Sequence, residues 1–218
     1  MSKRWKPANV LGMLAVLWCI TSPASGAPFT CQGEEKARIA KVGQSVVSRP
    51  SRHELRVLVN GKTLKFIDKA PYGEDMDGTR YEFCDRQDGY ILLQFFDDMV
   101  FTGKLIDEAS GAVTPGGEDV ILSPDRRAYF ASEQPDGLDG NVWKIYAING
   151  KQSWSGYSFI TEPGNADMAM AYLSAPAWDD KGRFSATAQC ANSRKTWKTT
   201  LTKNAGAWDW SPIVKCKK

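Results

Sequence analysis

The sequence predicts an all-β protein built as one antiparallel meander, and three features support this fold class. Short runs of alternating apolar and polar residues, typical of half-buried strands, recur along the chain. Turn signals such as Asn60-Gly61 and Asp88-Gly89 separate these runs about every 20 to 30 residues. No long stretch shows a clear amphipathic helix, so a helical or α/β class is not expected.

The first half of the chain predicts two hairpins. Residues 55–68 form two alternating runs around Asn60-Gly61, a dipeptide that readily adopts the positive φ values of a type I′ turn. Residues 81–97 repeat the pattern around Asp88-Gly89, and residues 100–107 predict a further strand before a turn at Ser110-Gly111. Residues 31–48 have weak helical periodicity, which predicts a short helix or a loop.

The second half is organised around a hairpin formed by residues 128–132 and 142–148. Ser123-Pro124-Asp125 precedes the first of these runs and Asn149-Gly150 follows the second. Further strands are expected at residues 152–159, 168–173, 184–189, 196–202 and 207–214.

Two turns in this half resemble a known repeat. In Ile121-Leu-Ser-Pro-Asp-Arg-Arg-Ala and in Trp178-Asp-Asp-Lys-Gly-Arg-Phe, turn acceptors and a base precede a strand. Both are similar to the turn of TolB-type and WD40-like β-propeller blades, in which an acidic or hydroxyl side chain caps the turn. Residues 102–111 resemble the strand-turn of such blades, although the glycine expected at Arg126-Arg127 is missing and the two copies lie farther apart than neighbouring blades usually do. The resemblance implies a small β-propeller-like fold of about four blades, and a β-sandwich is the alternative.

The first 26 residues predict a secretory signal peptide. Lys3, Arg4 and Lys6 are followed by an apolar run of 11 residues, Val10 to Ile20, and then by a small-residue exit at Ala24-Ser25-Gly26. A helix of that length is too short to span a bilayer core of about 30 Å. We therefore expect residues 27–218 to form one domain in the periplasm or outside the cell, with no membrane span after cleavage. An uncleaved anchor or a lipid attached at Cys19 are the less favoured alternatives.

The charge balance and the cysteine content restrict the class of protein further. The chain has 28 Lys and Arg against 25 Asp and Glu, but the leader holds three bases and no acid, so the rest is balanced. A neutral body argues against nucleic-acid binding, which needs many phosphate-neutralising cations. Four cysteines remain after the leader, and in an exported chain they predict two disulfides. Of the three connectivities, the local one, Cys31–Cys84 with Cys190–Cys216, is preferred.

Candidate binding residues lie near the C-terminus. All six tryptophans beyond the leader fall between Trp143 and Trp210, and residues 181–218 hold nine bases against one acid. Most of these rings are expected in the core, but exposed members beside the basic residues would suit a protein or glycan partner. The alternative is that the basic end lies against the acidic remainder. The candidates are Trp178, Trp197, Trp208, Trp210, Arg194, Lys195 and Lys198.

Catalytic and cofactor motifs are sparse. His53 is the single histidine, and the sequence contains no Gly-x-Ser-x-Gly turn, no phosphate-binding loop and no dinucleotide motif, so no cofactor is expected. Neighbouring carboxylates such as Asp179-Asp180 point to opposite faces of a strand and do not form an acid/base couple. The weak metal candidates Asp136, Asp139 and Asn141 lie in a Gly-rich loop that is better explained as a turn.

These observations predict an exported binding protein that is not an enzyme. The preferred interpretation is a protein-interaction module, such as a periplasmic inhibitor or immunity protein. A glycan-binding or cell-wall-binding module is the second hypothesis, and a carboxylate-dependent hydrolase is the third.

Overall fold

The computed structural model describes residues 26–72, 78–97, 100–135, 141–162 and 164–216. Residues 1–25 of the predicted leader lie outside these ranges. Within them the chain forms four antiparallel sheets, and in every sheet the strands that pair are consecutive in sequence. The predicted antiparallel all-β meander is therefore confirmed.

The four sheets follow one another along the chain. Sheet 1 is preceded by the one helix of the described residues, α1 (Glu35–Val42), and contains β1 (Val47–Ser51), β2 (Glu54–Val59) and β3 (Lys62–Ile67). Sheet 2 contains β4 (Thr79–Gln87), β5 (Tyr90–Asp97), β6 (Val100–Asp107) and β7 (Val113–Pro115). Sheet 3 contains β8 (Asp119–Leu122), β9 (Ala128–Glu133), β10 (Val142–Ala147) and β11 (Gln152–Tyr157). Sheet 4 contains β12 (Phe159–Glu162), β13 (Asn165–Trp178), β14 (Phe184–Cys190), β15 (Thr196–Asn204) and β16 (Ala207–Ser211).

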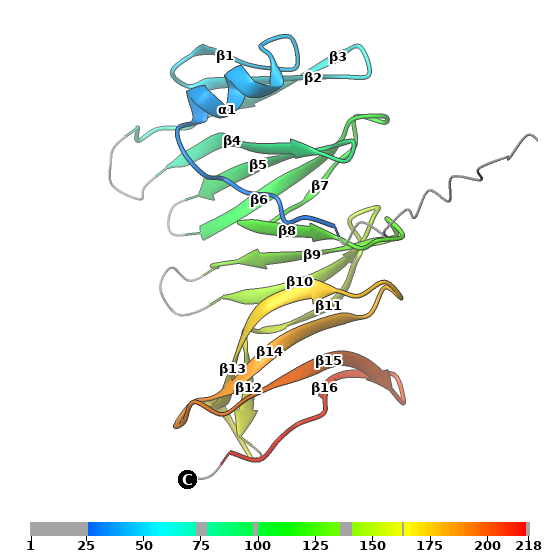
Figure 1. Ribbon diagram of the computed structural model, residues 1–218. Helices are drawn as coiled ribbons and strands as arrows, with labels where there is room; N and C mark the ends of the chain where they lie inside the picture. The colour runs from blue at the N-terminus through cyan, green and yellow to red at the C-terminus, as the bar shows by residue number, and fades with distance from the viewer. Residues whose placement is uncertain (1–25, 73–77, 98–99, 136–140, 163, 217–218) are drawn as a thin grey trace, which may run out of the picture.

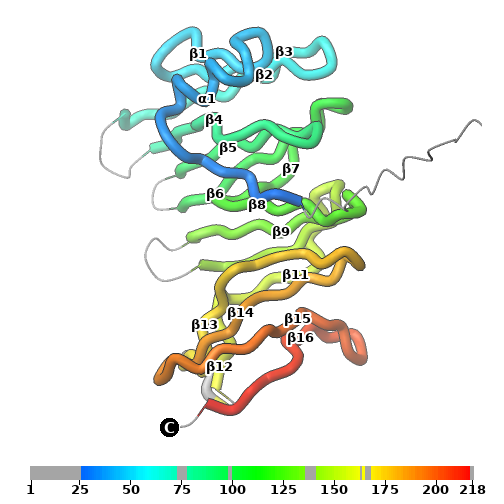
Figure 2. The backbone as a smooth tube through the Cα atoms, viewed as in Figure 1, coloured from blue at the N-terminus to red at the C-terminus, as the bar shows by residue number. Residues whose placement is uncertain are grey.

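Figure 1 shows these sheets stacked in a row, with sheets 1 and 4 at opposite ends. In Figure 2 the colours of the four sheets change in order from one end of the row to the other, so the order of the sheets in space follows their order in sequence, whereas the blue segment before α1 runs back to β8. In this view the four sheets form an open stack in which the first and last sheets do not meet, whereas the blades of a propeller close into a ring.

The predicted hairpins are present because their turn residues adopt the required backbone conformation. Asn60 and Gly61 have φ values of 47° and 70°, and Asp88 and Gly89 have 57° and 81°. These left-handed values match the type I′ turn, whose twist fits the two strands it joins. The last predicted strand is shorter than expected: β16 ends at Ser211 because Pro212 has no N–H to continue the ladder.

Three hydrophobic cores lie between consecutive sheets, so the two middle sheets bury both faces. On β9, Tyr129 and Ala131 pack toward sheet 2, whereas Phe130 packs toward sheet 4. On β5, Leu92 belongs to the core shared with sheet 3, and its neighbour Ile91 to the core shared with sheet 1. Successive side chains of a strand point to opposite faces, so a continuous apolar run is what a doubly covered sheet requires.

Both turns that carry the blade-like pattern are capped by an acid. Asp125 accepts hydrogen bonds from the Ser123 hydroxyl at 2.7 Å and from the Arg127 N–H at 3.1 Å. Asp179 accepts from the N–H groups of Lys181 and Arg183 at 3.0 and 2.8 Å. These bonds, together with the Arg183 side chain, hold the pKa of Asp179 below its usual value. The turns are thus stabilised locally.

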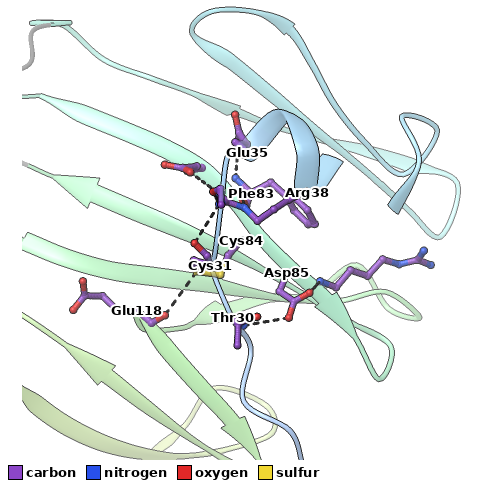
Figure 3. The surroundings of a disulfide bond; sticks show 11 residues. Thr30, Cys31, Glu35, Arg38, Phe83, Cys84, Asp85 and Glu118 are labelled. Carbon is purple, nitrogen blue, oxygen red and sulfur yellow. Dashed lines mark hydrogen bonds and ion pairs between the residues drawn. A yellow bond between two sulfur atoms is a disulfide. The ribbon is translucent and has the colours of Figure 1, made fainter. Parts of the chain in front are cut away.

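Both disulfides have the preferred pairing, and each fastens one end of the described chain. Cys31–Cys84 joins the segment before α1 to β4, and Cys190–Cys216 joins the C-terminal tail to the end of β14. Figure 3 shows the first bridge, beside which the Thr30 N–H donates to Asp85 at 3.2 Å. The preceding Phe29 is buried in the core between sheets 2 and 3 and donates its N–H to Val120 at 3.0 Å. The N-terminal segment therefore links the edges of both middle sheets.

Candidate recognition surface

Among the described residues, no other sheet covers the outer side of sheet 4, here called the distal face. The inner side of the same sheet packs on sheet 3 through residues such as Leu173, Phe184 and Leu201. Register places the residues of the distal face in rows across the strands. The rows are Phe159, Tyr172, Gln189 and Thr196; then Ser174, Thr187 and Lys198; then Ser185, Thr200 and Ser211.

An aromatic group lies at the β12 edge of this face. Tyr172 is 56% exposed and stands opposite Phe159. Phe159 stacks on Tyr157, with ring centroids 5.0 Å apart and an interplanar angle of 10°. Large exposed rings next to polar side chains are typical of recognition sites. Sequence reasoning placed a strand here but did not single out these rings, because alternation alone does not show which face is the outer one.

Three of the predicted basic residues lie at or next to the distal face. Arg194 and Lys195 occupy the turn between β14 and β15, and Lys198 lies on the face itself; all three are exposed. Within the described part of the chain, none of them forms an ion pair, so their charges are available to an anionic partner. The structure thus brings these bases to the same sheet as Tyr172.

The predicted tryptophans are divided between core and surface. Trp178 and Trp210 are 8% and 7% exposed and belong to the core between sheets 3 and 4, so they present no ring face to a partner. Trp178 also donates its indole N–H to the Ile121 carbonyl at 3.0 Å. The half-buried Trp197 donates to the Pro212 carbonyl at 3.0 Å. Trp208 is 37% exposed, and the Lys203 ammonium lies 5.8 Å from its ring centroid.

Burial of Trp178 and Trp210 has a simple cause. Both point to the inner side of sheet 4, where Trp210 meets Trp143 and Trp154 edge-on and Trp178 contacts Phe184. Trp208 lies on the same side of the sheet as Trp210, because residues two apart in a strand point to the same face. It lies near the β15–β16 turn, however, and beyond the end of the core. Of the four predicted rings, only Trp197 and Trp208 are accessible in part.

A second cluster of charged side chains fills the junction between sheets 1 and 2. Arg49 forms a bidentate ion pair with Glu35, at 2.6 and 2.9 Å, and donates to the Tyr81 carbonyl at 2.5 Å. The buried Asp68 accepts the Tyr81 N–H at 2.9 Å. Glu35, Arg49, Asp68 and Tyr81 line part of a cavity of about 420 Å³. Their polar groups are used by one another, so the cluster holds the two sheets together.

The same cluster closes the open edge of β4. The Phe83 N–H donates to Glu35 at 2.7 Å, and Arg38 donates to the Phe83 carbonyl at 2.9 Å; Figure 3 shows both side chains directed at Phe83 from α1. Arg38 also pairs with Glu82. Sequence reasoning missed these residues because the partners are 44 to 48 positions apart and no local pattern links them.

His53 and Asp119 contact other side chains of the protein. His53 stacks on Tyr72 at 3.8 Å, and its Nδ1 lies 3.9 Å from Asp68, beyond hydrogen-bond distance. Burial and the charge of Asp119 raise the pKa of Glu118, but Asp119 itself bonds the Ser132 hydroxyl at 3.0 Å.

Asp136 and Asp139 lie outside the described residues, and the Asn141 carbonyl accepts the Ser158 N–H at 2.9 Å. No group of His, Cys, Asp or Glu able to hold a metal ion occurs in the described ranges.

Comparison with protein-family models, with curated proteins and with solved structures gave no match to this chain. The interpretation therefore depends on the molecule itself. Among the described residues, no helix has the length and apolar character needed to cross a bilayer. The two disulfides are typical of proteins that fold outside the reducing cytoplasm.

Proposed function

We propose that the protein is an exported, non-enzymatic binding protein, in the periplasm or secreted, that recognises another protein through the distal face of sheet 4. Inhibitors and immunity proteins of the cell envelope belong to this class. The observation that carries the proposal is the combination, at or next to the distal face, of the exposed Tyr172 with three bases, Arg194, Lys195 and Lys198, that form no ion pair within the described residues.

The chemistry of this face suits a protein partner with an acidic rim. Tyrosine and arginine are enriched at protein interfaces, since a large ring with a polar end contributes contact area and a guanidinium contributes directed hydrogen bonds. Exposed bases at the border of such a patch raise the association rate with an acidic partner more than they raise its affinity. The leader and the two disulfides support an envelope or extracellular setting.

Affinity capture with matched variants tests the proposal. The full chain, produced by export so that both disulfides form, is immobilised and exposed to envelope extract of the source organism at low and high salt. We expect a partner that the wild type retains and that both Tyr172→Ser and Arg194→Glu/Lys195→Glu lose. Leu58→Ser is the control, because Leu58 is 46% exposed on sheet 1, at the opposite end of the row.

Two results contradict the proposal. One is capture of the same partner with equal yield by the wild type and by both distal-face variants. The other is a partner that the Leu58→Ser control loses and the distal-face variants keep.

A glycan is the second candidate partner, and the middle of the distal face favours it. Thr187, Gln189 and Thr196 present hydroxyl and amide groups beside Tyr172, and this combination binds sugar hydroxyls and stacks on sugar rings. Peptidoglycan fragments titrated against the wild type and Tyr172→Ser test this candidate. Saturable binding that the variant lacks supports it, and equal binding by both proteins contradicts it.

A further inference from the structure

Every sheet has two edge strands, whose outer N–H and C=O groups can pair with another chain unless a device prevents it. Seven of the eight edge strands of the described sheets carry a charge or a proline; β4 contains Arg80 and Glu82, and β8 contains Asp119. β1 contains Arg49-Pro50, β3 contains Lys62 and Lys65, β7 has three residues and ends in a proline, β12 ends in Glu162, and β16 contains Asp209.

Two of these seven edges, β4 and β8, are in addition closed by the protein's own groups. On β4 the backbone groups of Tyr81 and Phe83 are bound by side chains from α1 and sheet 1, as described above. On β8 the Val120 carbonyl accepts the N–H of Phe29. These contacts replace a neighbouring strand and block pairing.

The remaining edge strand, β11, has none of these devices between Gln152 and Tyr157, and only beyond its end does the Ser158 carbonyl accept the Leu173 N–H of β13, at 2.8 Å. No strand of the described residues pairs with its outer side. From Gln152 to Ser158 the sequence QSWSGYS contains neither a charged residue nor a proline. Segments of high β-propensity without charge or proline are the ones most prone to pair with another strand. Across the ladder, Lys144 lies opposite Ser155 and is already paired with Glu133 at 2.6 Å.

Hydrogen-bond geometry identifies the free groups. Ser158 donates its N–H to Asn141 on the β10 side, and the register is continuous from there to Ser155. Hydrogen-bonded and non-hydrogen-bonded pairs alternate in an antiparallel ladder. Tyr157 and Ser155 therefore occupy non-hydrogen-bonded pairs, and the N–H and C=O of both residues point away from β10. Both side chains are exposed.

We propose that the β11 edge pairs with the same edge of a second copy of this chain, in antiparallel register about a two-fold axis at Gly156. Ser155 of each copy then stands opposite Tyr157 of the other, and each of these two pairs exchanges two backbone hydrogen bonds. A second copy is the favoured occupant because self-pairing of an uncharged segment brings no like charges together. Such an interface is isologous and closes after two subunits.

Sedimentation velocity on the full chain, produced by export, tests this proposal from about 1 μM to about 1 mM, a range that brackets weak dimers. We expect a concentration-dependent dimer. Ser155→Glu/Tyr157→Glu places like charges opposite each other in both pairs, and we expect it to raise the dissociation constant at least about tenfold. Ser155→Glu/Tyr157→Lys places opposite charges there, and we expect a dissociation constant within about threefold of the wild type.

The two variants change the same exposed residues, so the comparison separates the proposed register from a general effect of charge. Circular dichroism and tryptophan fluorescence confirm that both remain folded. A wild type that is monomeric over the whole range overturns the proposal, and so does a dimer that both variants weaken equally or that neither weakens. The proposal does not rest on the proposed function, because it concerns the β11 edge and its test uses no partner.

Discussion

Removal of the Cys31–Cys84 disulfide should loosen sheets 1 and 2 before sheets 3 and 4. The bridge closes a loop of 53 residues, which corresponds to about 4 kcal/mol in the chain-entropy model. This is a large fraction of the total stability of a typical domain, which is on the order of 10 kcal/mol. The variant Cys31→Ala/Cys84→Ala avoids a buried hydroxyl, since Cys84 is 1% exposed.

The loss should be local because of what the bridge holds. It fixes the segment that places Phe29 in the core between sheets 2 and 3, and it precedes α1, whose Glu35 and Arg38 close the β4 edge. In a stack where each sheet contacts its neighbours, stability is approximately a sum over units and interfaces. Sheets 1 and 2 therefore lose their end fastening, whereas sheet 4 keeps Cys190–Cys216.

Two probes separate the halves of the molecule in a urea titration. Every tryptophan of the described residues lies between Trp143 and Trp210, so tryptophan fluorescence reports on sheets 3 and 4, while far-ultraviolet circular dichroism reports on all strands. We expect the two curves to coincide for the wild type, and the dichroism of the variant to fall at lower urea than its fluorescence. Coincident curves for the variant, or a total loss below about 1 kcal/mol, would refute this reasoning.

Removal of the other bridge is the matched control for that experiment. Cys190–Cys216 closes a loop of 26 residues, which corresponds to about 3.5 kcal/mol. Because this bridge fastens the tail to β14, its loss should shift the fluorescence curve to lower urea.

Three further outcomes follow from individual contacts. Trp178→Phe should lower the free energy of unfolding by about 1 to 3 kcal/mol, measured by urea denaturation, because the Ile121 carbonyl loses its indole donor; an unchanged midpoint would contradict this. Burial raises the pKa of Tyr129 from 10.0 to about 12. The free energy of unfolding should therefore be unaffected below pH 10 and should fall by up to about 3 kcal/mol between pH 10 and 12. A spectrophotometric titration in which all tyrosines ionise near pH 10 would disprove this prediction. Gly103→Ala should lower the free energy of unfolding by more than about 2 kcal/mol or prevent folding, because the added Cβ would lie 2.4 Å from the Gly117 carbonyl oxygen. A variant with the melting temperature of the wild type would refute this prediction.

Much of the fold could be predicted because its signals are local. Asn60-Gly61 and Asp88-Gly89 each determine a turn through the conformations that two adjacent residues prefer, and strands of alternating pattern follow on either side. The disulfide pairing could also be predicted, because each bridge joins two cysteines that are consecutive among the four that follow the predicted leader.

The candidate recognition surface was harder to predict because exposure depends on position in the stack. Trp178 and Trp208 are both aromatic residues near turns in sheet 4, yet one lies in the core and the other beyond its end. Tyr172 follows the same alternation as its neighbours, and its ring is exposed because no further sheet of the described residues packs on that side. The Arg49–Glu35 pair arises from two elements that fold back on each other, which no short pattern reports.

The open row of sheets also bears on how the polypeptide acquires its structure. Each sheet is complete within its own stretch of chain and needs only the sheet before it to cover one side, so a chain that emerges amino end first can add finished layers one at a time. One contact forms late: the N–H of Phe29 can bind the Val120 carbonyl only after the residues of sheets 1 and 2 have been synthesised. That late contact joins the earliest residues of the domain to its third layer.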